Sequence, residues 1–553
     1  MPRVRTRPAT ITAAAPLAVV AALFIAITAA ATLQILHAVG EPIYPIDDVY
    51  IHMAMARSLA EHGVYGVTPH EATHASSSPA WVLLLAAAFA ATGPWTWWPG
   101  LLAGVASLAL LAIASMYLRL QATGLAGFAD VGGRTGVRSL TVPGGSVPAL
   151  TLQGMEHPLL AAAILLAAVL GAQAIADPQP HRRRDMALAA LCFVLPLLRY
   201  ESLWLTALLA AALLWRRRRG LALALLAASA AAVCAVGFWA ISQGLTFLPA
   251  PILTKSVGPL LLSEDGLQRL VARFTWHPLS RISRVPLLAV LFAAAVAWLA
   301  VALWRRRLGL LDDARAIMVA LFAGGTWIHA TFATFGWGSR YEAYLIALGI
   351  AALGATALAL PGSLDGARRP HRLAGLLAEK LAHLPKYSAL ERAHRPYAKT
   401  QRAPVEGPNR DVFVARFLAA AYPGDSVLAM NIGAVVWAGS PRLTDPVALG
   451  TPAALDLFLA GRLNAGTVDA LAAERGVQVF AVFDEWFAEW LGGSPPWLAA
   501  AEIDASNQRR RLLLRLYVRD EVAGRTLAER LTRIRPEGRF SAEMRLLAPF
   551  GPH

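Results

Sequence analysis

The segment from Tyr44 to His52 contains the residues best suited to chemistry, because two carboxylates, Asp47 and Asp48, are adjacent there. The segment follows an apolar stretch long enough to span a bilayer, so both carboxylates are expected close to the membrane surface. A carboxylate in that position can act as a general base toward a hydroxyl group, and nearby hydrocarbon raises its pKa. The alternative is structural, with Asp47 or Asp48 capping the helix predicted to follow. Taken alone, the segment favours the cap.

Further ionisable residues lie in or beside apolar stretches. Arg199 and Glu201 interrupt the apolar stretch 187–215, while Glu156 and Arg340 adjoin others. Because ionisable groups are costly in hydrocarbon, they usually pair with one another or face an aqueous cavity. A structural ion pair and a functional site are therefore both open interpretations.

The sequence gives little indication of a cofactor. Asp47, Asp48, His52 and Glu71 could surround a divalent ion such as Mg²⁺ or Mn²⁺, but the spacings HExxH and CxxC are absent. No Walker loop or GxGxxG element follows a predicted strand, so a nucleotide-sugar or ATP donor in a soluble fold is unsupported. We predict no certain cofactor, with a divalent cation as a possibility.

The elements that must position these residues are apolar helices. Hydrophobic residues make up 57% of the chain, more than one soluble core can bury. Runs of membrane-spanning length fall at 14–38, 98–119, 157–176, 220–243, 285–304, 314–333 and 342–360. The stretch 187–215 is predicted to form a hairpin of two short helices, 77–93 a helix along the membrane surface, and 124–150 a weaker span. The expected fold is a polytopic α-helical membrane protein with about ten crossings.

The net charge of +15 is explained by membrane topology rather than by nucleic acid. Arginine runs at 182–184, 216–219 and 305–307 lie in short connections, which the positive-inside rule places in the cytoplasm. The N-terminus is then inside, and residues 39–97 lie outside. The expected location is the inner (plasma) membrane, with the active site on the extracytoplasmic, periplasmic side.

The character of the chain changes after residue 360. We expect residues 1–360 to form the membrane domain, 361–410 an amphipathic linker, and 411–553 a small α/β domain. Helices are predicted at 411–421 and 468–475, and strands at 426–430 and 477–483. Ten crossings return residue 361 to the cytoplasm, and a count that differs by one puts the C-terminal domain outside. The sequence does not decide on which side of the membrane the C-terminal domain lies.

The first outer loop resembles the GT-C glycosyltransferases, as found in actinobacterial arabinofuranosyltransferases and many bacterial relatives. Asp47 to Gly63 is similar to their DDAYIHLRYARNLAEGHG, including Tyr50, His52 and Arg57. Glu71 matches the glutamate of their GERVEGYTSPLW, and Ser77 to Trp81 stands where TSPLW is expected. This sequence has His74 where that pattern has its second glutamate.

Four weaker matches follow in the same order along the chain. Residues 154–159 resemble GMETPL, 199–201 resemble RPE, 251–256 resemble PNTFYAKS, and Arg340 with Tyr341 resembles the RY that opens a late span. The resemblance thus covers residues 40–345.

The resemblance implies an inverting transfer on the outer face, from a polyprenyl-phosphate sugar to a glycan, lipid or protein acceptor. It makes Asp47 the general base, with Asp48 as second choice. A leaving lipid phosphate needs a cation, and Lys255, the only lysine in residues 1–360, is the expected one. A snorkelling interfacial lysine is the alternative. The implied substrate-binding set is Lys255, Arg199, Glu201, Arg340, Tyr341, Glu71, Glu156, His52 and Arg57.

Two other classes of function compete with an enzyme. A transporter or flippase of a lipid-linked glycan also has many spans with charged residues, and an envelope-assembly protein uses its spans only as an anchor. The enzyme is favoured because the ionisable residues concentrate in outer loops and no inverted repeat is visible.

Overall fold

The computed structural model describes residues 10–121, 146–177, 179–255, 266–304, 309, 311–336, 339–358, 408–439, 441–504, 513–534 and 544–550. The chain divides into two compact units. The first, called here the helical unit, comprises Met1–Gln34, Gly100–Ala232 and Leu260–Lys399. The second, the α/β unit, comprises Ile35–Pro99, Val233–Pro259 and Thr400–His553. The predicted linker 361–410 lies almost entirely outside the described residues.

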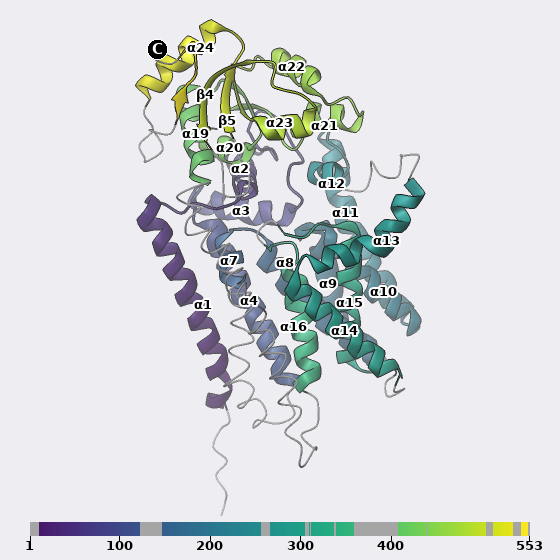
Figure 1. Cartoon of the computed structure of the whole chain (residues 1–553). Helices are drawn as coiled ribbons and strands as arrows, with labels where there is room; N and C mark the ends of the chain where they lie inside the picture. The colour runs from purple at the N-terminus through teal and green to yellow at the C-terminus, as the bar shows by residue number, and fades with distance from the viewer. Residues whose placement is uncertain are drawn as a thin grey trace, which may run out of the picture. The chain divides into compact units, whose positions relative to one another are not determined.

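The helical unit consists of helices, most of them apolar; Figure 1 labels them. In chain order they are α1 (Thr10–Val39), α4 (Trp98–Gln121), α7 (Ser146–Leu152), α8 (His157–Ala176), α9 (Arg182–Leu198), α10 (Leu203–Trp215), α11 (Arg219–Ser242), α13 (Gly266–Ser283), α14 (Pro286–Trp304), α15 (Ala314–Phe332) and α16 (Ala343–Leu358). The last residues of α1 and α11 belong to the α/β unit. Each strong predicted span and the predicted hairpin at 187–215 correspond to these helices, whereas most of the weak span 124–150 is outside the described residues.

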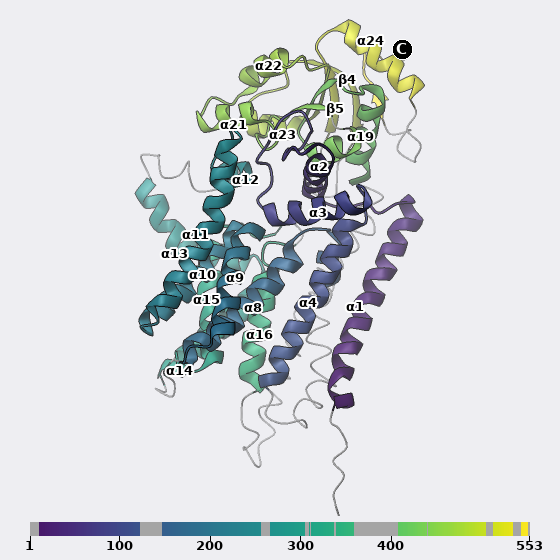
Figure 2. The ribbon, with the colours of Figure 1, turned by 180° about the vertical axis from the view of Figure 1, so that it is seen from behind.

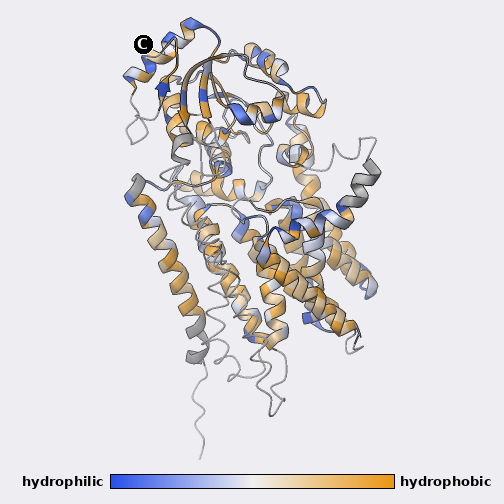
Figure 3. Ribbon diagram, viewed as in Figure 1, coloured by the Kyte–Doolittle hydropathy of each residue, from blue (hydrophilic) through white to orange (hydrophobic). Residues whose placement is uncertain are grey.

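Five helical segments in the described ranges are long and apolar enough to cross a membrane, judged by length and composition. They are Leu17–His37, Trp98–Gln121, His157–Ala176, Arg219–Ser242 and Pro286–Trp304. Figure 3 shows hydrophobic residues along most of the length of these helices. Shorter apolar helices, among them Tyr200–Trp215 and Ala343–Leu358, supplement them. The protein is therefore a polytopic membrane protein.

The core of the helical unit forms around α8, which packs against α9, α10, α15 and α16. Helix α9 ends at Leu198 because Arg199 adopts an extended backbone, three residues after the internal Pro196. A short 3₁₀ turn, η2 (Tyr200–Ser202), then leads into α10. This interruption brings Arg199 and Glu201 between two short apolar helices.

The C-terminal part of the α/β unit is a six-stranded sheet with the order β2-β1-β3-β5-β4-β6. Its strands are β1 (Ser426–Ala429), β2 (Arg442–Thr444), β3 (Val479–Phe483), β4 (Leu498–Asp504), β5 (Leu513–Val518) and β6 (Arg545–Leu546). Strand β1 pairs parallel to β2 and β3, and the other pairings are antiparallel. The predicted small α/β domain is confirmed, with β1 and β3 at the expected positions.

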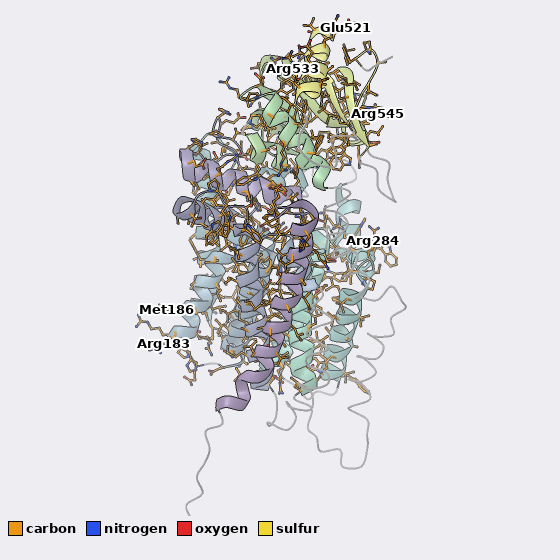
Figure 4. All side chains as sticks on the ribbon, turned by 90° about the vertical axis from the view of Figure 1, so that its left-hand side faces the viewer. Arg183, Met186, Arg284, Glu521, Arg533 and Arg545 are labelled. Atoms are coloured by element: carbon orange, nitrogen blue, oxygen red, sulfur yellow. The ribbon has the colours of Figure 1, made fainter. Side chains whose placement is uncertain are left out.

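Helices surround this sheet (Figure 1). They are α19 (Pro408–Ala421), α20 (Ile432–Gly439), α21 (Pro452–Leu459), α22 (Ala465–Glu474), α23 (Asp484–Leu491) and α24 (Glu521–Arg533). Charges at the ends of α24 complement the helix dipole, with Glu521 in its first turn and Arg533 in its last. Both lie at the surface of the unit, as does Arg545 of β6 (Figure 4).

The remaining helices of the α/β unit come from the two predicted outer loops. Helix α2 (Asp47–His62) ends at Gly63, whose left-handed backbone (φ 71°) suits glycine. Helix α3 (Pro79–Thr92) begins with proline at its first position, and α12 (Ala250–Lys255) follows α11. Helix α2 packs against both α3 and α20, and Figure 2 shows α2 next to α3.

Candidate active site

Asp47, the predicted base, is the first residue of α2 and interacts with the start of α20. Its Oδ2 accepts a hydrogen bond from the Gly433 N–H at 2.8 Å, and its Oδ1 accepts one from the Ala434 N–H at 2.9 Å. These are two of the N–H groups that a helix leaves without an internal partner. The N-cap of α2 itself is Ile46, with no side-chain cap bond. The cap interpretation was therefore wrong for α2, although Asp47 does cap a different helix.

Burial raises the pKa of Asp47 to about 6, and the hydrogen bonds from Gly433 and Ala434 oppose this rise. The nearby carboxyl groups of Asp48 and Asp445 add to it. A carboxyl group with this pKa is mostly ionised at neutral pH and is more basic than an ordinary aspartate. Each carboxylate oxygen also has a second lone pair, so the two N–H contacts leave capacity to accept a proton. The environment of Asp47 therefore suits a general base.

Asp48 and His52 accompany Asp47 on α2. Asp48 is partly buried, and His52 is 5% exposed.

Arg57 interacts with the other end of α20. Its two terminal nitrogens donate to the carbonyl oxygens of Val436 and Trp437, each at 2.9 Å. The guanidinium carbon also lies 4.7 Å from the centre of the Trp437 ring. Because these carbonyls belong to the last turn of α20, Arg57 satisfies acceptors that the helix leaves unpaired. These contacts show a structural use for a residue that the resemblance assigned to substrate.

Glu71, which matches the motif glutamate, is held by an arginine that the sequence analysis did not identify. Arg475, just beyond α22, donates to Glu71 Oε1 at 2.6 Å and to the Leu443 carbonyl at 2.9 Å. The two side chains are 25% and 29% exposed. No sequence signal links them, because 404 residues separate them.

Lys255 is the last residue of α12. Helix α12 packs against α21, and both lie in the α/β unit, as Asp47 does. The environment of the Lys255 side chain is outside the described part of the chain.

In the helical unit, Arg199 connects two predicted site carboxylates. It donates to Glu156 Oε1 at 2.8 Å and makes a two-point contact with Glu201, at 3.0 and 2.6 Å. Glu156 is fully buried, at 0% exposure, and Arg199 is 9% exposed. Planar two-point pairing of this kind is the strongest form of arginine–carboxylate contact.

Arg340 and Tyr341 belong to the same cluster. The Tyr341 ring lies 5.2 Å from the guanidinium carbon of Arg199 and 4.9 Å from that of Arg340. The His157 ring packs edge-on against Tyr341 at 5.8 Å. The structure thus brings together Glu156, Arg199, Glu201, Arg340 and Tyr341, whereas Glu71 belongs to the other unit.

The sequence analysis also missed a buried set of hydrogen-bonded side chains, formed by Trp204, Tyr344 and His329. Trp204 Nε1 donates to the Tyr344 hydroxyl at 3.1 Å, and this hydroxyl lies 2.7 Å from His329 Nδ1. His329 Nε2 lies 3.1 Å from the Thr334 carbonyl, which can only accept. In a neutral ring His329 therefore donates from Nε2, and Tyr344 donates to Nδ1. The only sequence signal for this set of hydrogen-bonded side chains is a histidine in an apolar helix.

Within the described residues, no group of three or more His, Cys, Asp or Glu side chains is arranged to hold a metal ion. The possible divalent cation remains a sequence-based expectation.

The two units together define a class: a polytopic helical membrane protein with charged groups at helix ends and a C-terminal α/β domain. No protein-family model matches the sequence, and no curated protein matches it. Among solved structures, the chain is similar to ArnT from Cupriavidus metallidurans bound to undecaprenyl phosphate, with 13% identity, a TM-score of 0.50, and coverage of 89% of this chain and 97% of that one. The apo state of the same protein gives 14% identity and a TM-score of 0.46, with the same coverage.

The likeness to ArnT establishes the fold. It is a polytopic helical membrane domain with a small C-terminal sheet, as the sequence predicted.

Proposed function

We propose that the chain is a membrane glycosyltransferase that transfers a sugar from a polyprenyl-phosphate donor to a cell-envelope acceptor. The observation that carries this proposal is the likeness in fold to ArnT, a protein solved with undecaprenyl phosphate bound, over 89% of this chain. The ordered motifs from Asp47 to Arg340 support the same class of reaction. The acceptor is a glycan, lipid or protein, and the reaction takes place on the extracytoplasmic side of the inner membrane.

In the proposed reaction, Asp47 takes the proton from an acceptor hydroxyl as that oxygen attacks the anomeric carbon. The bond from this carbon to the phosphate oxygen breaks, and polyprenyl phosphate leaves with the electron pair. This single displacement inverts the configuration of the sugar. Burial raises the pKa of Asp47 to about 6, and this value supports Asp47 as the general base.

The leaving phosphate gains negative charge, so the proposal includes cations that stabilise it. Lys255 is assigned to this phosphate, and the cluster of Arg199, Glu201, Arg340, Tyr341 and Glu156 to the substrates.

The test of the function and of the base is transfer by the purified full-length chain from a panel of synthetic polyprenyl-phosphate sugars. We expect turnover by the parent and a loss of at least about a hundredfold in Asp47→Asn, as for removal of a general base. The amide group in this variant also presents a donor to the N–H groups of α20, so thermal unfolding must show that the variant is folded.

Three outcomes contradict parts of this proposal. Parent-like turnover by folded Asp47→Asn removes Asp47 as the base. Complete loss in Asp48→Asn with retained activity in Asp47→Asn assigns the role to Asp48. Transport of a lipid-linked glycan in vesicles without any transfer contradicts the enzyme.

The assignment of Lys255 predicts a graded response to substitution. Lys255→Ala should lower turnover strongly, Lys255→Arg should retain part of it, and Lys255→Glu should retain none, because the phosphate needs a positive charge. Donor binding is measured separately with undecaprenyl phosphate. If Lys255→Glu binds and turns over the donor like the parent, Lys255 only anchors the chain at the interface.

A further inference from the structure

Two short connections of the helical unit form a charged surface that none of the assigned roles uses. One connection lies between α8 and α9, and the other lies between α10 and α11. The spanning segment His157–Ala176 ends where the first connection begins, and the spanning segment Arg219–Ser242 begins where the second one ends. Because a spanning helix leaves the hydrocarbon at its ends, both connections lie at the level of the lipid headgroups.

Arg218, in the second connection, holds the two together. It donates to the Ala174 carbonyl oxygen of α8 at 2.8 Å and to Asp185 Oδ2 of α9 at 2.6 Å. Arg184 donates to the other oxygen of Asp185 at 3.2 Å, so two guanidiniums pair with this carboxylate. The start of α9 is therefore fixed beside the turn between α10 and α11.

Four exposed arginines flank these contacts. They are Arg182 and Arg183 at the start of α9, and Arg217 and Arg219 between α10 and the start of α11. Within the described ranges, none of their side chains makes an ion pair or a hydrogen bond. They present positive charge that the described part of the fold does not neutralise.

The acidic side chains that meet this surface, among the described residues, are already paired. Asp177, Asp185 and Asp312 each make an ion pair with an arginine other than those four. Asp313, next to Asp312, caps α15 and pairs with Arg315. The surface therefore has a surplus of positive charge, contributed by the four exposed arginines.

Large apolar side chains are exposed beside the same arginines. Trp215, the last residue of α10, is 81% exposed, and Met186, one turn after Arg183 on α9, is 60% exposed. Figure 4 shows Met186 and Arg183 on the same side of the helical unit. Tryptophan is enriched at the boundary between hydrocarbon and headgroups, and arginine side chains reach from there toward the headgroups.

A partner that fits this surface must combine an anion with apolar groups. A free phosphate or a nucleic acid pairs with arginine but does not cover Met186 and Trp215. An anionic phospholipid does both, because its phosphate accepts two-point hydrogen bonds from a guanidinium and its acyl chains cover apolar side chains. The positive-inside rule also predicts these arginine runs on the cytoplasmic side, where anionic lipids attract basic segments.

We propose that this surface binds anionic phospholipids, with the phosphates on its arginines and the acyl chains on its apolar side chains. The residues of this lipid surface are Arg182, Arg183, Arg217, Arg219, Met186 and Trp215. None of them has a role in the proposed transfer reaction, so the proposal stands independently of it.

The binding is tested with the purified full-length chain in detergent, titrated with phosphatidylglycerol or with phosphatidylcholine of the same acyl chains. Native mass spectrometry counts the bound lipids. We expect phosphatidylglycerol to bind at least about tenfold more tightly than phosphatidylcholine, because each arginine near anionic headgroups contributes about fivefold. Arg183→Gln/Arg217→Gln removes one charge from each connection and should weaken phosphatidylglycerol binding at least about tenfold, with phosphatidylcholine binding unchanged.

The matched control is Arg525→Gln/Arg533→Gln, which removes two exposed arginines of α24 in the α/β unit. It should bind phosphatidylglycerol like the parent. In detergent without phosphatidylglycerol, both double variants should unfold at the parent's temperature, because exposed arginines add little to stability.

Three results overturn the proposal: equal binding of the two lipids by the parent, parent-like phosphatidylglycerol binding by the folded Arg183→Gln/Arg217→Gln variant, or an equal loss of binding in the control. Competition with glycerol phosphate, a soluble headgroup without acyl chains, decides the class of partner. We expect an excess of glycerol phosphate to leave the lipid bound. Displacement of the lipid by an equal concentration would show that the surface is a site for a soluble anion and would also overturn the proposal.

Discussion

At the scale of single residues, the environment decides what each charged group does. Arg199 neutralises two carboxylates, one of which, Glu156, is fully buried. Among the described residues, Asp47 instead accepts from backbone N–H groups, and burial raises its pKa to about 6. A buried pair of opposite charges contributes little net stability, but a lone buried charge is strongly destabilising.

Arg199→Ala is therefore expected to destabilise the protein by about 3–5 kcal/mol, because it removes the cation that pairs with both Glu156 and Glu201. Thermal unfolding in detergent measures this effect. Arg183→Ala is the control, since Arg183 is exposed near the start of α9 (Figure 4) and should have almost no effect. Equal, small effects of both changes would show that the cluster does not depend on Arg199.

At the scale of elements, α2 and α20 run side by side in the same direction. Asp47 interacts with the first N–H groups of α20, and Arg57, ten residues further along, interacts with its last carbonyls. A negative charge at the helix N-terminus and a positive charge at the C-terminus both stabilise a helix. The close approach depends on Gly433, where an added Cβ would lie 2.2 Å from the Asp47 carbonyl oxygen.

Gly433→Ala is expected to separate the two helices, destabilise the protein by about 1–3 kcal/mol and reduce transfer. The pH dependence gives a specific readout. Asp47 has a raised pKa of about 6 in the folded chain. Protonation of Asp47 therefore adds to the free energy of unfolding below pH 4, and this contribution is lost as the pH rises through 6. In Gly433→Ala, separation of α2 and α20 hydrates the Asp47 carboxylate and lowers its pKa. The loss of stability with rising pH should therefore be smaller in this variant. The acid limb of its pH–activity profile should also move to lower pH.

Asp445, whose pKa burial also raises to about 6, should retain its own contribution to the same pH dependence. Gly493→Ala is the control, because nothing lies within 4 Å of an added Cβ there. A Gly433→Ala protein with the parent's stability and pH profile would show that α20 does not position Asp47.

At the scale of the whole molecule, the packing of α2 on α20 puts the C-terminal domain on the same side of the membrane as the loop that carries Asp47. We therefore expect an odd number of crossings before the domain. Because the arginine runs predict that this loop lies outside, we expect a reporter fused after residue 553 to be active only if it is an extracytoplasmic reporter such as alkaline phosphatase. Activity of a cytoplasmic reporter at that position would contradict this topology.

The sequence by itself determined the local structure. Apolar runs of about 20 residues predict helices of membrane-spanning length wherever they occur, and Arg199 and Glu201 mark the interruption between α9 and α10. Strands β1 and β3 were also predictable. All of their residues are buried, and all except Ser426 are apolar, so each strand appears in the sequence as a short apolar run. The motif residues predict where the chemistry takes place.

Only the tertiary structure decided which groups those residues meet. Asp47 and the Gly433 N–H are 386 residues apart, and Glu71 and Arg475 are 404 apart. Periodicity reports only neighbours along one helix or strand, so it carries no information about such pairs. The partner of a charged side chain depends on which distant backbone or side-chain groups the fold leaves unsatisfied beside it, and this is fixed only when the elements pack.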